Sequence, residues 1–429
     1  MKLADNAGTG DASSTGSVAF LSFVAALGGV LFGYDTAVVS GTISDVAGRF
    51  GLDAMAKGWY VGCALVGSIA GVAVAGWLSD RFGRKPTMLL SSVLFSVSAL
   101  GCAFCAGFDD LVAYRIVGGV GIGVVSIVSP VYISEISPAK IRGTMVSLYQ
   151  LAITLGFVLA YLVNYLLLVN LHVGELWRVM LGAEAAITLL FFAVIFFIPE
   201  SPRWLALRAG GSARSRRVPW GEVVRPGILK AIAIGCALAV LGQFMGVNAV
   251  LYYGPEIFAN AGFAAQESSF STVLVGVVNM VSTVIAVFLV DRVGRKALVY
   301  FGVSVMVACL VTIGAFFRLE VSGVAFVAVF LAYIFAQAVS VSAVVFVLLS
   351  EMYPNNVRGV AMSVAGLALW VGTYLVGQFT PWCMDALGPS GTFFFFAAMC
   401  LPYLAIVWRL VPDTAGRSLE EIEEYWRKP

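Results

Sequence analysis

Three charged residues lie inside long apolar runs, and their types suit them to bind and release a proton. These residues are Asp35, Arg115 and Glu184. A charge at bilayer depth costs at least about 2.5 kcal/mol, so each one requires a partner or a function. A nearby guanidinium favours the ionised form of a carboxyl group and burial favours the neutral form, so a carboxyl under both influences can switch. We expect Asp35 and Arg115 to lie at similar depth; a permanent ion pair between two helices is the alternative.

The elements that position these charges are predicted to be transmembrane helices. Of the 429 residues, 60% are apolar and 12% are charged, whereas soluble proteins average roughly 45–50% and about 25%. This composition excludes a cytosolic enzyme, a nucleic-acid-binding protein and a disordered chain. Apolar runs of about 20 residues indicate helices that cross a bilayer. Twelve spans are predicted, at 18–41, 59–79, 87–107, 111–134, 144–170, 178–198, 228–254, 268–290, 298–317, 322–349, 360–382 and 391–411.

The distribution of Lys and Arg predicts the orientation of these spans. Cytoplasmic loops of membrane proteins are enriched in both residues. Twenty-one of the 26 lie in the even-numbered loops and the two termini, and four lie in the odd-numbered loops. Both termini are therefore predicted to be cytoplasmic.

The sequence also repeats itself. Asp80-Arg-Phe-Gly-Arg-Lys85 recurs as Asp291-Arg-Val-Gly-Arg-Lys296, and Glu135-Ile-Ser-Pro recurs as Glu351-Met-Tyr-Pro at nearly the same separation along the chain. Two parallel halves with substrate held between them are typical of carriers that work by alternating access. The predicted division is an N-terminal cytoplasmic tail (1–17), a six-helix half (18–204), a short cytoplasmic linker (205–227), a second six-helix half (228–411) and a C-terminal cytoplasmic tail (412–429).

Five motifs, in order along the chain, resemble those of the sugar porters of the major facilitator superfamily, and most closely the bacterial proton–xylose symporters. The motifs are Gly29-Val-Leu-Phe-Gly-Tyr-Asp-Thr-Ala-Val-Val-Ser-Gly41, Gly76-Trp-Leu-Ser-Asp-Arg-Phe-Gly-Arg-Lys85, Ser134-Glu-Ile-Ser-Pro-Ala-Lys-Ile-Arg-Gly143, Pro199-Glu-Ser-Pro-Arg-Trp204 and Gly246-Val-Asn-Ala-Val-Leu-Tyr-Tyr253. The resemblance implies an all-α membrane protein of twelve helices. It also implies a secondary active transporter that imports a pentose or a hexose together with protons.

The resemblance assigns roles to the charged residues. Family members with an acid at the position of Asp35 are proton-coupled, and uncoupled members usually have Asn there, so we expect Asp35, paired with Arg115, to couple transport to protons. Glu184 matches a family acid on the sixth span and serves either as a proton relay or as a latch between helices. A second set lies at the predicted cytoplasmic ends of helices in both halves, where family members form salt bridges that hold the outward-facing state. It comprises Asp80, Arg81, Arg84, Glu135 and Arg142, with Asp291, Arg292, Arg295, Glu351 and Arg358 as their counterparts.

The sugar site is implied by polar and aromatic residues on the spans. Asn and Gln amides offer a donor and an acceptor to hydroxyl pairs, and aromatic faces cover the apolar side of a sugar ring. An interhelical hydrogen bond is the alternative role for such an amide. The residues that match the family site are Phe32, Gln150, Gln243, Asn248, Tyr253, Asn279 and Trp370. The chain departs from the family at Phe157, Gly242 and Leu369, where glutamines are expected, at Phe346, where tryptophan is expected, and at Ser342-Ala343, where Gly-Pro is usual.

Other functions are less consistent with the sequence. An uncoupled sugar facilitator and a carrier of another polyol such as inositol are the alternatives within transport. A membrane sugar sensor is the alternative outside it, but sensors usually append a long tail and only a short segment follows Val411. No nucleophile–base pair, metal-ligand cluster or phosphate-binding motif is present, so we expect no enzyme activity, metal or cofactor. The expected partners are a sugar, a proton and bilayer lipids, without nucleic acid, and we expect a monomer in a bacterial inner membrane.

Overall fold

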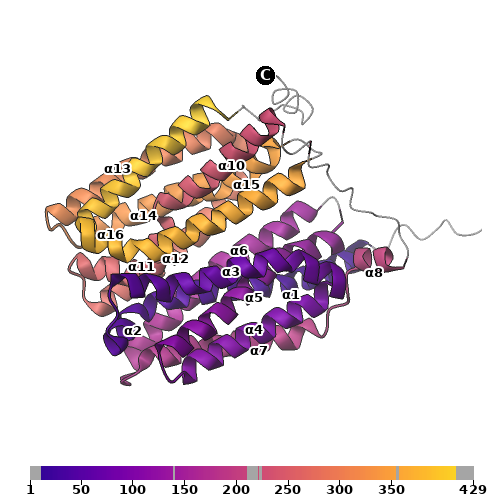
Figure 1. Ribbon diagram of the computed structural model, residues 1–429, viewed down its shortest axis with the longest axis horizontal. Helices are drawn as coiled ribbons and strands as arrows, with labels where there is room; N and C mark the ends of the chain where they lie inside the picture. Colours follow the sequence, from indigo (N-terminus) through magenta and orange to yellow (C-terminus); the bar gives the residue numbers. More distant parts are fainter. Residues whose placement is uncertain (1–10, 139–140, 210–220, 222–224, 354–356, 412–429) are drawn as a thin grey trace, which may run out of the picture. The chain divides into compact units, whose positions relative to one another are not determined.

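The computed structural model describes residues 11–138, 141–209, 221, 225–353 and 357–411. Eleven helical segments of this part are long and apolar enough to cross a membrane. The last of them, α16, has 52 residues and contains a kink at Gly388, where φ is +71°. A helix needs about 20 residues to cross a bilayer, and the segment on each side of the kink is at least that long. The helix α16 therefore contributes two spans, and the predicted twelve-helix architecture is confirmed. In Figure 1, α16 doubles back on itself at this kink.

The contacts between helices divide the chain into two compact units. Unit 1 contains Met1–Thr36, Gly67–Ala160 and Leu181–Arg214. Its helices are all or parts of α1 (Asp11–Val38), α3 (Ala54–Phe82), α4 (Arg84–Phe104), α5 (Phe108–Ile136), α6 (Arg142–Asn170), α7 (Leu176–Ile195) and α8 (Pro202–Arg208). In this unit α4 and α5 pack along one another. The backbones of α3 and α5 also approach closely at Gly67 and Gly71, because a Cβ atom on either glycine would overlap a carbonyl oxygen of α5; small residues permit such contacts in membranes.

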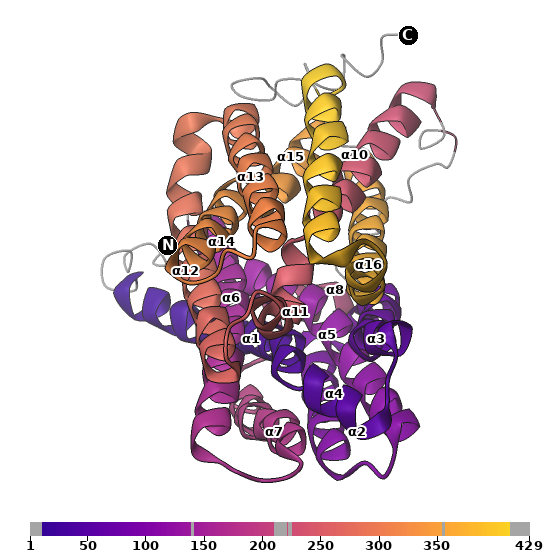
Figure 2. The ribbon, with the colours of Figure 1, turned by 90° about the vertical axis from the view of Figure 1, so that its left-hand side faces the viewer.

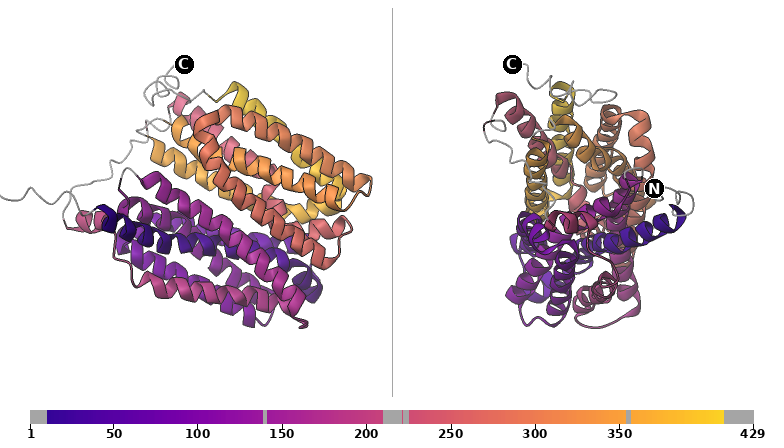
Figure 3. Two further views of the ribbon diagram at one scale, coloured as in Figure 1. Left: turned by 180° about the vertical axis from the view of Figure 1, so that it is seen from behind. Right: turned by 90° about the vertical axis from the view of Figure 1, so that its right-hand side faces the viewer.

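Unit 2 contains Ala37–Val66, Tyr161–Met180 and Ser215–Pro429. It therefore joins the end of α1 and parts of α3, α6 and α7 to the C-terminal helices. The predicted division at 205–227 follows the sequence repeat rather than these contacts, and it stays a prediction. The described residues do not include 210–220 and 222–224 of that linker, 1–10 of the N-terminal tail or the C-terminal tail at 412–429. Figures 2 and 3 show α12 (Ala265–Val293), α13 (Arg295–Arg318) and α14 (Val324–Gln337) side by side in this unit. Its further helices are η1 (Val39–Gly41), α2 (Ile43–Phe50), α10 (Pro226–Phe244), α11 (Val247–Asn260), α12 (Ala265–Val293), α13 (Arg295–Arg318), α14 (Val324–Gln337), η2 (Ala338–Ser342) and α15 (Ala343–Met352).

Two spans of unit 2 are interrupted. The seventh span breaks between α10 and α11 at Gly246, whose φ of +91° is accessible to glycine without strain. The tenth span contains a π-helical turn, η2, which ends at Ser342, the first of the two positions where Gly-Pro is usual. Such turns in α-helices frequently occur at functional sites. The tenth span is therefore interrupted without the expected Gly-Pro.

The repeated motifs adopt matching conformations. Gly83, between α3 and α4, has φ +105°, and Gly294, between α12 and α13, has φ +89°. Positive φ favours glycine over residues with a Cβ atom. The glycine of each Asp-Arg-x-Gly-Arg-Lys motif thus makes the same tight connection in both halves of the sequence.

Candidate functional site

The three buried charges predicted to couple transport lie together in unit 1. Arg115 Nη1 on α5 donates to Asp35 Oδ1 on α1 at 2.6 Å, and both side chains are at most 2% exposed. The same guanidinium points at the backbone carbonyl of Asp35 at 3.3–3.4 Å. Glu184 on α7 is 2% exposed and lies beside both residues. The structure therefore brings all three predicted residues into one cluster.

Local packing explains why these helices meet at this point. Gly118 lies one turn beyond Arg115 on α5, and a Cβ atom there would overlap the Ser98 hydroxyl of α4 and lie 3.6 Å from Asp35 Oδ1. A larger residue would push α5 away from α1 and α4. The glycine thus lets the guanidinium and the carboxylate approach.

The charges of this cluster balance only when it holds one proton. Asp35 and Glu184 supply two carboxyl groups against the single positive charge of Arg115. A buried net charge is very costly, so the neutral arrangement has one ionised and one protonated carboxyl. Asp35 Oδ2 and Glu184 Oε1 are buried without a hydrogen-bond partner among the described residues. These two oxygens are therefore unpaired acceptors inside the cluster.

Two of the predicted sugar-binding amides lie on either side of the Gly246 break in unit 2. Asn248 Nδ2 on α11 donates to Gln243 Oε1 on α10 at 2.6 Å. The Thr373 hydroxyl on α16 lies 3.2 Å from the same oxygen. Tyr333 donates to the Met245 carbonyl at 2.7 Å, which satisfies a backbone oxygen freed by the break. Both amides remain only half-buried, as expected of polar groups that face the interior of a bundle.

The other predicted sugar-site residues differ in their surroundings. The Tyr253 hydroxyl is fully buried and donates to the Gly377 carbonyl at 2.6 Å, so this tyrosine anchors α11 to α16. Asn279 on α12 is 8% exposed. Trp370 on α16 is half-buried, as is Phe32 of unit 1, whereas Gln150 of unit 1 is exposed. Of the departures, Phe157 and Gly242 are buried and Leu369 is half-buried, and the side chain of Phe346 lies outside the described part.

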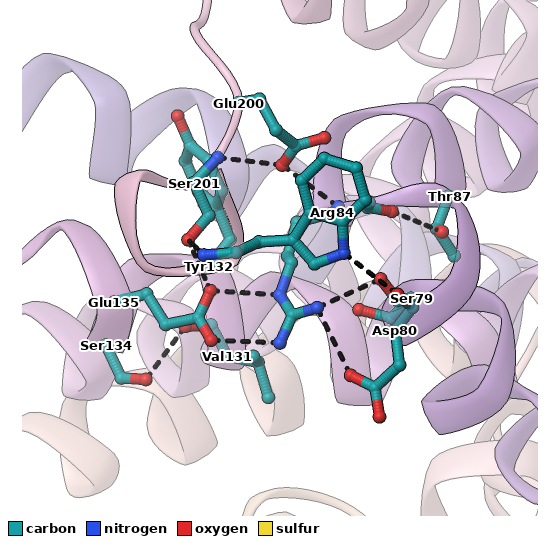
Figure 4. A network of polar contacts seen from close by, with 12 residues as sticks. Ser79, Asp80, Arg84, Thr87, Val131, Tyr132, Ser134, Glu135, Glu200 and Ser201 are labelled. Atoms are coloured by element: carbon teal, nitrogen blue, oxygen red, sulfur yellow. Dashed lines mark hydrogen bonds and ion pairs between the residues drawn. The ribbon is translucent and has the colours of Figure 1, made fainter. Parts of the chain in front are cut away.

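Arg84 is the centre of a polar network at one end of unit 1 (Figure 4). Its guanidinium makes a bidentate pair with Glu135 at 2.9 and 3.0 Å, and it also donates to Asp80 and to the Ser79 carbonyl. The Arg84 and Glu135 side chains are 7% and 5% exposed. Ser201 donates a further hydrogen bond to Glu135. Bidentate pairs of this kind fix geometry as well as charge.

The second half contains part of the equivalent network. Arg295 Nη2 pairs with Glu351 at 2.9 Å, with side chains 21% and 24% exposed. Arg142 and Arg358 each donate to the backbone carbonyl five residues earlier, that of Ser137 or Tyr353. The remaining members are Arg81, stacked on Trp77 and Phe82, Arg292, which is exposed, and Asp291, whose side chain lies outside the described residues.

Two groups of interacting residues were not predicted from the sequence. Glu200 accepts from the backbone amides of Arg84 and Ser201 at 3.0 and 2.7 Å, so the quoted Pro-Glu-Ser-Pro motif belongs to the Arg84 network. Lys57 on α3 pairs with Glu256 on α11 at 2.9 Å within unit 2. The Pro-Glu-Ser-Pro motif could have indicated the role of Glu200. No sequence pattern could have indicated the pair of Lys57 and Glu256, because 199 residues separate them. Within the described chain, no group of three His, Cys, Asp or Glu side chains could hold a metal ion.

Comparisons with known proteins agree with this architecture. Residues 21–219 and 210–426 match the family of sugar (and other) transporters. The chain is 37% identical to the arabinose-proton symporter of Bacillus subtilis over 97% of this chain and 96% of the relative. It is 35% identical to the D-xylose-proton symporter of Escherichia coli over 95% of each chain. The inward-open structure of the E. coli xylose transporter superposes with a TM-score of 0.84, at 33% identity, over 95% of this chain and 100% of that one.

Proposed function

Because the chain belongs to the sugar transporter family of the major facilitator superfamily, whose members are carriers and not enzymes, we propose that it imports a monosaccharide together with a proton. The proposed substrate is a pentose such as xylose or arabinose, or a hexose. Relatives named for arabinose–proton and xylose–proton symport support this choice. The proposed location is a bacterial cell membrane, where the protein works as a monomer.

The observation that carries proton coupling is the excess of carboxyl groups over guanidinium groups in the buried cluster. Asp35 and Glu184 face one Arg115, so the cluster is neutral with one proton and negative without it. Moving a charged cluster between water-accessible and closed states is costly in a low dielectric medium. We propose that the carrier changes state readily when the cluster is loaded with a proton, and that Glu184 shares this proton with Asp35.

We propose that the two amides beside the Gly246 break contribute to the sugar site. Gln243 and Asn248 lie at the discontinuity of a transmembrane helix, a position that transporters use for substrate binding. Trp370 and Asn279 of the same unit are proposed to contribute to it. For Phe32 and Gln150 of unit 1 we propose sugar-binding roles on the resemblance to the family alone. Tyr253 acts in this proposal through its anchoring bond to Gly377 rather than by contact with sugar.

The Arg84 network and its counterpart around Arg295 are proposed to bias the conformational equilibrium. Each contains an arginine–glutamate pair within its own unit. An interaction shifts a two-state equilibrium only by the difference in its energy between the states. We propose that both networks are intact in one state and are loosened in the other.

Uptake into proteoliposomes tests the proposed function. Purified protein is assayed with radiolabelled L-arabinose, D-xylose, D-glucose and myo-inositol, with and without an inwardly directed proton gradient. The proposal expects at least one monosaccharide to accumulate only when the gradient is present. Uptake of inositol alone would refute the monosaccharide assignment, and equal uptake in both conditions would indicate a facilitator.

A further inference from the structure

The carboxamide of Gln243 is held in one orientation by its neighbours. Its oxygen accepts from Asn248 Nδ2 at 2.6 Å, and its nitrogen lies 3.4 Å from the Ala239 carbonyl oxygen. Turning the amide over would place two amino groups face to face at Asn248 and two acceptors together at Ala239. Amide orientations are assigned from such networks, and here both contacts select the same orientation.

Thr373 is a third neighbour, and it comes from a different helix. Its hydroxyl lies 3.2 Å from Gln243 Oε1 and 2.9 Å from the Leu369 carbonyl, so its proton is shared between two acceptors. The residue is 6% exposed. The preceding Gly372 brings α16 close to α10, because a Cβ atom there would lie only 3.2 Å from Gln243 Cγ. Thr373 is thus built into the packing around the amide.

We propose that Thr373 is a positioning residue that helps to hold the Gln243 amide in its orientation and thereby influences what the sugar site can recognise, an inference that rests on the proposed transport of a sugar. With its oxygen occupied by Asn248 and Thr373, Gln243 presents an N–H donor to the substrate. Asn248 uses one N–H of its amino group on Gln243, and its carbonyl oxygen is available as an acceptor. The pair therefore recognises two sugar hydroxyls with different hydrogen-bonding roles. One hydroxyl accepts a hydrogen bond from Gln243, and the other donates a hydrogen bond to Asn248.

Deoxy and deoxyfluoro sugars distinguish these two senses. Fluorine retains a weak acceptor but carries no proton, whereas hydrogen supplies neither. The probe is whichever of L-arabinose, D-xylose and D-glucose the wild-type protein exchanges fastest, and its analogues at each ring hydroxyl compete in a counterflow assay. At the hydroxyl read by Gln243, the fluoro analogue should compete about two- to tenfold better than the deoxy analogue, the range expected for one hydrogen bond. At the hydroxyl read by Asn248, both analogues should be equally poor.

Three variants test the role of the hydroxyl. Thr373→Val removes one of the three contacts that hold the Gln243 amide, so the preference for fluoro over deoxy analogues should fall. Thr373→Ser keeps the hydroxyl and should restore the preference. The matched control is Thr380→Val on the same helix, where the hydroxyl donates to the Val376 carbonyl, and it should keep the wild-type pattern.

Each outcome decides a specific point. A Thr373→Val protein that binds every analogue more weakly by one common factor would show a structural role and overturn the assignment. Equal behaviour of the valine and serine variants would also overturn it. If the wild-type protein exchanges none of the three sugars, the proposed function fails and this assignment fails with it.

Discussion

Replacing Asp35 with Asn should abolish accumulation of sugar against its gradient and leave exchange of sugar across the membrane. In the wild-type protein, Asp35 and Glu184 together exceed the charge of Arg115 by one. After the substitution, an ionised Glu184 alone balances Arg115, and the cluster is neutral without a proton. The variant should therefore complete its transport cycle without binding a proton.

The expected magnitude follows from this charge balance. One proton per cycle driven by a gradient of one pH unit supplies about 1.4 kcal/mol, which corresponds to about tenfold accumulation. The Asp35→Asn protein should instead stop at equal concentrations on both sides. Removing one partner of a buried ion pair typically costs about 3–5 kcal/mol. We expect a smaller loss of stability here, because Glu184 lies beside Arg115 and takes over as its partner.

The assay uses proteoliposomes with the membrane potential clamped at zero and the interior one pH unit more alkaline. The steady-state ratio of internal to external sugar is measured for the wild type, Asp35→Asn and Glu184→Gln, and counterflow is measured in parallel. The Glu184→Gln protein should also reach a ratio of one, since Asp35 then balances Arg115 without a proton. Glu175→Gln is the control, because Glu175 pairs with Arg49 and Arg178 outside the cluster.

Two results would refute this reasoning. Tenfold accumulation by Asp35→Asn would show that the proton is carried elsewhere. Accumulation by Glu184→Gln, with loss in Asp35→Asn, would show that Asp35 carries the proton alone and that the balance of two carboxyls against one arginine is irrelevant.

Three further predictions concern packing and charge. Glu135→Gln leaves Arg84 buried without its bidentate carboxylate and should lower the free energy of unfolding by about 3–5 kcal/mol, which would appear as a lower melting temperature in detergent. Gly246→Ala forces a Cβ atom onto a backbone with φ +91° and should destabilise the protein by at least about 1 kcal/mol, measured in the same way. Lys57→Glu places two carboxylates together at the pair with Glu256 and should slow exchange, while the double variant with Glu256→Lys restores the pair and should recover most of the rate in counterflow.

The spans and the three buried charges could be predicted because each rests on a strong local signal. A carboxyl inside an apolar run is costly wherever it lies, so Asp35 and Glu184 were evident before any contact was known. The kink of α16 at Gly388 was also predictable as a boundary between two apolar runs. These features depend on the composition of single apolar runs and not on which helices are neighbours.

The remaining features depend on contacts between distant segments. Lys57 and Glu256 are 199 residues apart, and 130 residues separate Thr373 from Gln243. No periodicity within one helix indicates that such residues will meet. The Tyr253 hydroxyl donates to the Gly377 carbonyl, 124 residues away along the chain, because a buried hydroxyl requires a partner. Its predicted place at the sugar site stays a prediction.

The duplication itself suggests how the chemistry is divided. The two halves of the sequence can be aligned so that Pro199 pairs with Pro412. The separation of these two prolines along the chain lies between the separations of the two repeated motifs. In this alignment Asp35 corresponds to Asn248. The first half thus places a titratable carboxyl where the second half places an amide. In the same alignment, the other two buried charges, Arg115 and Glu184, correspond to Ala328 and Ala397.

The backbone differs at the same equivalent position. Gly33 lies within the continuous helix α1, whereas its counterpart Gly246 breaks the seventh span at φ +91°. The unbroken helix holds a carboxylate against an arginine, and the broken helix turns Gln243 and Asn248 toward each other. Amides do not titrate, so the proposed binding groups of the second half keep their hydrogen-bonding pattern at any pH, whereas the proposed coupling cluster of the first half can gain or lose a proton. Under the proposed assignments, sugar recognition and proton binding respond independently to their ligands, and only the change of conformation has to couple them.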